Sequence, residues 1–153
     1  MSDAIFRRAT RDDLPTIVAM LADDFLGQTR ERPDDLAPYL RMFELIDASP
    51  DQELIVMERD GEIVGSLQLT YIPYLTHSGA LRAVVEAVRV ASSRRGTGVG
   101  HELFGWVVAR VRERGCEVLQ LSTDKRRVDA KRFYEDLGFV ASHEGMKLDL
   151  GSH

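Results

Sequence analysis

Three alternating glycines, Gly96, Gly98 and Gly100, form the part of the sequence best suited to bind a phosphate. Glycine allows the backbone conformations in which successive N–H groups face one anion. Apolar residues then recur at every fourth position, which predicts a helix that begins in the glycine run: Val99, Leu103, Val107 and Val111. The unpaired N–H groups of such a helix start favour a phosphate or pyrophosphate, and Arg94 and Arg95 add positive charge.

Two common nucleotide-binding motifs do not fit this turn. A dinucleotide-binding G-x-G-x-x-G would need glycine at position 101 or 103, where His101 and Leu103 stand. A P-loop would need Gly-Lys-Ser/Thr, and the sequence has Gly100-His101-Glu102. The turn is therefore either a phosphate-binding turn of another kind or a plain connection between a strand and a helix.

Glu86 is a carboxylate in a stretch that is otherwise typical of a buried strand. Residues 81–90 are rich in β-branched side chains. In a regular pleat Glu86 would share its face with Val84 and Val88, where a charge calls for a functional or structural reason. The structural alternatives are an ion pair with Arg82 or Arg89, or a bulge that turns Glu86 to solvent.

The periodicities and turn residues predict an α/β protein with one mixed sheet in the order β-α-α-β-β-β-α-β-α-β-β. The predicted strands are 4–9, 53–59, 62–73, 81–90, 117–123, 139–143 and 146–150. The predicted helices are 10–27, 33–49, 99–114 and 129–137. Thr10 begins the first helix as a capping box, Asp60-Gly61 joins a hairpin, and residues 139–150 close the sheet as another hairpin.

Two segments at the expected separation resemble motifs of the GNAT superfamily of acyl-CoA N-acetyltransferases. Residues 95–100, Arg-Gly-Thr-Gly-Val-Gly, resemble its Q/R-x-x-G-x-G/A segment, and residues 130–139 resemble its A-x-x-F-Y-x-x-x-G-F segment. The resemblance covers residues 4–150 and is of the bacterial type. It implies the GNAT fold with splayed central strands, acetyl-CoA as co-substrate, and direct attack of a primary amine without a metal or a covalent enzyme intermediate.

The resemblance also implies roles for individual residues. It makes Tyr134 the general acid, because a phenol is protonated at neutral pH, and makes Glu86 a base that acts through water. The positions that match the family's coenzyme contacts are Val88, Arg89, Val90, Arg95, Gly96, Thr97, Gly98, Val99, Gly100, Arg127 and Ala130. Many members of the family carry Asn where this chain has Arg127. His77 and His143 are second choices for the base, and Cys116 is expected to pack rather than react.

The acceptor is less well defined by the sequence. Residues 121–134 also resemble aminoalkylphosphonate acetyltransferases, and a small-molecule amine is favoured over a protein N-terminus or lysine. A non-catalytic module that binds acyl-CoA is the alternative from another class. The irregular segments 23–32 and 71–77 are predicted to flank the acceptor beside Glu86, with Asp23 or Asp24 attracting its ammonium group.

Composition limits the other possibilities. A length of 153 residues with 44% hydrophobic and 29% charged residues predicts one compact domain. The resemblance makes residues 1–150 a single N-acetyltransferase domain, and residues 151–153 resemble a tag remnant. A net charge of -5 argues against nucleic acid as a partner. One cysteine and scattered histidines predict no metal, and the absence of a long apolar run or signal segment predicts a cytoplasmic protein without a membrane partner. A homodimer is possible.

Overall fold

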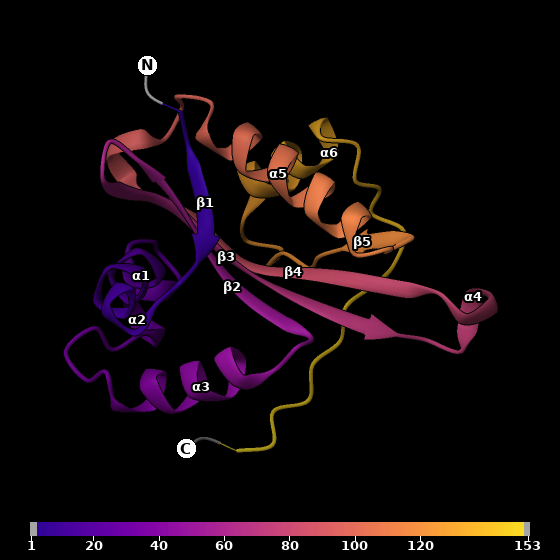
Figure 1. Cartoon of the computed structure of the whole chain (residues 1–153), viewed down its shortest axis with the longest axis horizontal. Coiled ribbons are helices and arrows are strands. Elements are labelled where there is room, and N and C mark those ends of the chain that lie inside the picture. The colour runs from indigo at the N-terminus through magenta and orange to yellow at the C-terminus, as the bar shows by residue number, and fades with distance from the viewer. Residues whose placement is uncertain (1–2, 152–153) are drawn as a thin grey trace.

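A five-stranded sheet forms the centre of the domain in the computed structural model, which describes residues 3–151 (Figure 1). The strands follow one another in chain order across the sheet: β1 Ile5–Arg8, β2 Gln52–Arg59, β3 Glu62–Pro73, β4 Leu81–Val90 and β5 Val118–Gln120. The first four strands are antiparallel neighbours, whereas β5 runs parallel to β4. This mixed sheet confirms the predicted fold class.

The helices lie on both sides of this sheet. They are α1 Leu14–Ala22, α2 Gly27–Arg30, α3 Ala37–Ala48, α4 Thr76–Gly79, α5 Val99–Glu113 and α6 Val128–Asp136, with 3-10 turns at Arg11–Asp13 and Ser92–Arg94. Residues 10–27 were predicted as one helix but form a 3-10 turn, α1 and the start of α2. The predicted capping box is present, with the Thr10 N–H donating to Asp13 at 2.7 Å. No helix within residues 3–151 has the length and apolarity needed to cross a membrane.

The main core lies between α5 and the sheet. All four apolar residues of the predicted α5 face are buried: Val99, Leu103, Val107 and Val111. They pack with inward-facing side chains of the strands, among them Ile55, Leu67, Leu69 and Val85. Burying one such side chain contributes about 1.5–3 kcal/mol, so this contact holds α5 against the sheet.

β4 and β5 separate along their length. β5 pairs only with Arg82 to Val84, so the β5-facing edge of β4 beyond Val84 has no strand beside it. The separation confirms the expected splay of the central strands. It leaves main-chain groups near the C-terminal end of β4 available to a ligand.

The predicted closing hairpin is wrong. Residues 139–151 form no strand, and the strand predicted over 117–123 is reduced to Val118–Gln120. Met146, Leu148 and Leu150 alternate as in a strand but are 93%, 84% and 90% exposed. Alternating apolar and polar residues favour an extended backbone but do not supply a neighbouring strand to pair with. A hairpin that packs against no other element is only marginally stable in water. Of the suspected tag remnant, Ser152 and His153 lie outside the described residues.

Candidate active site

A cavity of about 390 Å³ lies where β4 leaves β5, against the start of α6. Several residues expected to contact the coenzyme line this cavity together: Val88, Arg89, Val90, Arg95, Arg127 and Ala130. Asp24 and Phe25, from the connection between α1 and α2, form another part of its wall. The cavity is thus built from segments that are far apart in the sequence.

A bulge in β4 decides which way Arg89 points. Ser66 lies opposite Arg89 and Gln68 lies opposite Glu86, so two steps along β3 correspond to three along β4. Ala87 is the extra residue and has a φ of 54°, which is uncommon for a residue with a side chain. Because of this insertion, Arg89 and Glu86 share the sheet face toward α1 and α2. The expectation that a regular pleat places Glu86 on the face of Val88 is wrong, and the alternative of a bulge that turns Glu86 to solvent is confirmed.

Asp24 holds two arginines at the cavity wall. Its Oδ2 lies 2.8 Å from Arg127 Nη2 and 3.4 Å from Arg89 Nη2. Its Oδ1 accepts the Leu26 N–H at 2.9 Å and also the Gly27 N–H. Burial by itself would raise the pKa of Asp24, but the Gly27 amide and the two guanidinium groups outweigh it and lower the pKa. Asp24 is therefore an anion that fixes the cations of the site.

The sequence did not predict the different surroundings of Asp23 and Asp24, the two acids of the connection between α1 and α2. Asp23 lies 3.6 Å from Arg95, and the Arg95 guanidinium donates to the Asp23 carbonyl at 2.9 Å. Both acids thus face arginines rather than open space for an acceptor ammonium. A local signal existed, because Asp24 precedes Gly27 in a turn where a short acidic side chain can accept main-chain N–H groups.

The three glycines of the turn have different roles. Gly96 and Gly98 have φ values of 77° and 91°, so the left-handed conformation explains them. Gly98 directly precedes α5, whose first N–H groups lack partners within the helix. Gly100 lies inside α5, where an added Cβ would stand 3.1 Å from Phe133 Cζ. The third glycine thus brings α6 close to α5 and does not form the turn.

Tyr134 is packed in a cluster of aromatic rings behind the cavity. Its ring centroid lies 5.5 Å from that of Phe104 and 5.9 Å from that of Phe139. Burial raises the pKa of Tyr134, and the positive charges of Arg89 and Arg127 oppose that rise. The phenol therefore stays protonated at neutral pH and lies within electrostatic reach of both cavity arginines.

The other candidates for proton transfer are dispersed. Glu86 is exposed beside Gln68, and the alternative of an ion pair with Arg82 or Arg89 is not found among the described residues. His77 lies in α4 at the tip of the β3–β4 hairpin, and His143 contacts Ser142 at 2.7 Å in the exposed C-terminal segment. Burial raises the pKa of Cys116, which opposes thiolate formation.

The two segments expected to flank the acceptor lie at opposite ends of β4. Tyr71 is opposite Ala83 near the start of the strand, whereas Asp24 contacts Arg89 near its end. Figure 1 shows α4 far from α1 and α2. Tyr71 is buried and donates its hydroxyl to Glu53. The prediction that the acceptor enters between residues 23–32 and 71–77 is therefore wrong, because the extended strand β4 holds these two segments apart.

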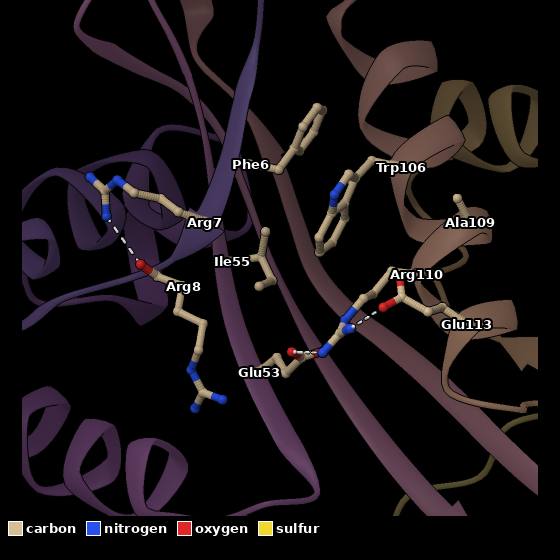
Figure 2. A pocket seen from close by; sticks show the side chains of 9 residues that line it. All are labelled: Phe6, Arg7, Arg8, Glu53, Ile55, Trp106, Ala109, Arg110 and Glu113. Carbon is tan, nitrogen blue, oxygen red and sulfur yellow. Dashed lines mark hydrogen bonds and ion pairs between the residues drawn. The ribbon is translucent and has the colours of Figure 1, made fainter.

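A second cavity, of about 410 Å³, lies between β1 and α5 (Figure 2). Its aromatic wall is the stacked pair Phe6 and Trp106, with ring centroids 5.2 Å apart. Its main charges pair with each other, since Arg110 Nη2 lies 2.6 Å from Glu53 Oε2. None of the predicted site residues lines it. The smaller cavity at β4 is therefore the better candidate for the active site.

The parted central strands, the glycine turn before α5 and the cationic cavity together make a site suited to a phosphate-bearing ligand. The sequence pattern of the Acetyltransferase (GNAT) family matches residues 14–139. The chain belongs to this family. Within residues 3–151, no group of three or more His, Cys, Asp or Glu side chains is arranged to hold a metal ion.

Similarity to characterised and solved proteins extends over most of the chain. It is 28% identical over 137 residues to aminoalkylphosphonate N-acetyltransferase of Salmonella typhimurium, covering 90% of this chain and 85% of that protein. It is 37% identical over 90 residues to glucosamine 6-phosphate N-acetyltransferase of Trypanosoma brucei brucei, covering 59% of each. A crystal structure from Bacillus halodurans C-125, described as a transcriptional regulator, matches with a TM-score of 0.92 and 49% identity over 97% of this chain and 100% of that chain.

Proposed function

We propose that residues 1–150 act as one N-acetyltransferase domain that moves acetyl from acetyl-CoA to a primary amine of a small molecule by direct attack. The observation that carries this proposal is the cavity at the open edge of β4, lined by residues that match the family's coenzyme contacts. Acetyl-CoA supplies the activated acetyl thioester. The chain supplies orientation, positive charge and a proton.

The residues around the cavity fit the coenzyme. The main chain of residues 88–90 would hold the pantetheine arm, because this edge of β4 has no strand partner. The turn from Gly96 to Gly100 and the N-terminus of α5 would hold the pyrophosphate together with Arg95. Arg127 and Ala130, at the start of α6, would contact the coenzyme on the opposite wall.

Tyr134 is proposed as the general acid that protonates the departing sulfur. Its raised pKa keeps the hydroxyl protonated at neutral pH, as an acid requires. Glu86 is proposed as the base, which receives the amine proton through water. It lies beside Gln68, on the face of the sheet that also carries Arg89. The acceptor would therefore approach from this face rather than through the segment at Tyr71.

The relatives support a small acceptor. Aminoalkylphosphonates and glucosamine 6-phosphate each combine an amine with a phosphonate or phosphate group. An amine screen with acetyl-CoA should therefore include aminoalkylphosphonates, amino sugar phosphates, their phosphorus-free counterparts and lysine peptides, with free thiol release as the signal. Release with small amines and not with peptides is the expected result. Thiol release with peptides alone would favour a protein acceptor.

Coenzyme binding can be tested separately by thermal shift. Millimolar coenzyme A should raise the melting temperature by mass action, and NADH should not. Arg95→Gln should weaken coenzyme binding about tenfold, through loss of a charge-assisted contact. Arg132→Gln is the matched control, because it removes the same charge from an exposed α6 side chain that does not line the cavity. Equal binding by both variants would contradict the assigned site. Stabilisation without acetylation of any amine would favour a non-catalytic acyl-CoA-binding module.

A further inference from the structure

Arg89 carries hydrogen-bonding groups that have no partner in the described part of the chain. Its Nη1 donates to the Val88 carbonyl at 2.9 Å, and its Nη2 lies 3.4 Å from Asp24. Its Nε is buried and has no hydrogen-bond partner among residues 3–151. The hydroxyl of Ser66, which is opposite Arg89 on β3 and 1% exposed, has none there either. Because buried polar groups normally have partners, these two groups indicate a place for a polar ligand.

The charges around Arg89 favour an anionic ligand. Asp24 faces both Arg89 and Arg127. Burial lowers the pKa of Arg89; Asp24 opposes this effect, and the positive charges of Arg127 and Arg30 add to it. Arg30 is itself paired with Glu31 at 3.0 Å. These three cations therefore face two carboxylates, and an anionic group of a ligand beside Arg89 would balance the remaining positive charge.

The coenzyme does not need the side chain of Arg89 in the proposed site. The pantetheine arm would use the main chain of residues 88–90 at the open edge of β4. The Arg89 side chain leaves the sheet on the face toward α1 and α2, where it meets Asp24 and lines the cavity. Glu86, the proposed base, shares that face. The guanidinium is therefore placed on the side from which the acceptor would approach.

Glu86 and Arg89 are spaced to hold the two ends of a short acceptor. They lie opposite Gln68 and Ser66, which are two residues apart on β3. Two residues of a strand span about 7 Å. Arg89 is also within electrostatic reach of Tyr134, the proposed acid. An acceptor with its amine near Glu86 and an anion at Arg89 would therefore have a short chain between the two groups and would stay beside the reacting atoms.

We propose that Arg89 binds an oxyanion which the acceptor carries in addition to its amine, an inference that rests on the proposed acetyl transfer. The acceptor class is thus a short zwitterion, an aminoalkyl phosphonate, phosphate or carboxylate. The unused Nε–H and the neighbouring N–H groups of Arg89 form a planar fork that fits two oxygens of such an anion. Asp24 and the Val88 carbonyl hold the guanidinium in place.

Binding to the protein saturated with coenzyme A tests this inference without requiring acetyl transfer. Calorimetric titrations compare 3-aminopropylphosphonate, 4-aminobutyrate and propylamine, which share an amine on a three-carbon chain. Wild type should bind the two anionic amines about 10- to 100-fold more tightly than propylamine, because only they make charge-assisted hydrogen bonds to Arg89. The tighter of the two anionic amines identifies phosphonate or carboxylate as the preferred oxyanion.

Substitutions of Arg89 should remove this preference and leave the coenzyme site intact. In Arg89→Gln the three amines should bind alike, and the thermal shift with coenzyme A should persist. Arg89→Lys keeps the charge that faces Asp24 but lacks the planar fork, so the preference should fall about threefold or more. Should Arg89→Gln fail to fold, Arg89→Lys decides. Arg82→Gln is the matched control, because Arg82 is on the same strand opposite Ile72 and does not line the cavity.

Two results would overturn the role of Arg89. One is equal binding of the three amines by wild type, and the other is a full preference for the anionic amines in both Arg89 variants. Failure of the proposed function would look different. A preference that depends on Arg89, without acetylation of any amine, would retain the anion site and contradict the transferase. Equal acetylation of propylamine and the anionic amines would retain the transferase and contradict the anion site.

Discussion

Replacing Asp24 by Asn tests whether the arginines of the cavity depend on one carboxylate. The amide keeps an oxygen for the Leu26 and Gly27 N–H groups but loses the charge that faces Arg89 and Arg127. The Asp24 and Arg89 side chains are only 14% and 13% exposed, so solvent replaces the lost charge poorly. Breaking a fully buried pair costs about 3–5 kcal/mol. For this slightly exposed one we expect a loss of about 2–3 kcal/mol in the free energy of unfolding.

The effect should depend on pH with a definite sign. Asp24 has a pKa below its usual value of 3.8 in the folded protein. Its charge therefore stabilises the fold fully above the unfolded-state pKa, and this contribution is lost as the pH falls through the folded-state pKa. The difference between wild type and Asp24→Asn should be largest near pH 7 and should shrink toward acid. Urea unfolding monitored by circular dichroism at several pH values measures it.

Asp23→Asn is the matched control for this experiment. Asp23 is in the same connection and faces Arg95, but its side chain is 56% exposed and the contact is 3.6 Å. An exposed pair of this kind contributes less than about 1 kcal/mol. Two results would refute the role of Asp24 in holding Arg89 and Arg127. One is an equal loss of unfolding free energy in both variants. The other is a loss in Asp24→Asn that does not change between pH 7 and acid.

Three further substitutions test other parts of the site. Tyr134→Phe should lower turnover about 100-fold in steady-state kinetics with little change in melting temperature, because the ring contacts remain; unchanged turnover with chemistry rate-limiting would remove Tyr134 from the mechanism. Gly27→Ala should cost about 1–3 kcal/mol in urea unfolding, since its Cβ would lie 1.9 Å from the Leu21 carbonyl oxygen; wild-type stability would show that the turn is not this tight. Gly100→Ala should displace Phe133, 3.1 Å from the new Cβ, and reduce the thermal shift with coenzyme A; an undiminished shift would mean that close packing of α5 on α6 is not needed for binding.

The sequence by itself predicted the elements whose signals are local. The repeat of Val99, Leu103 and Val107 predicted α5 because one helical face must be apolar to pack on a sheet. Asp60 and Gly61 predicted the β2–β3 hairpin, and both have the positive φ values, 54° and 77°, that a tight hairpin turn requires. The glycine turn and the segment around Tyr134 indicated the family, which the match over residues 14–139 established.

Only the tertiary structure decided how these elements meet. One inserted residue at Ala87 turns Arg89 to the face of Asp24, and periodicity cannot predict a bulge because it assumes a regular pleat. The need for glycine at position 100 likewise comes from close packing against Phe133, which is distant in the sequence. In residues 139–150 the apolar alternation indicated an extended segment, but whether such a segment becomes a strand depends on a free edge elsewhere, and that partner is not encoded in the segment itself.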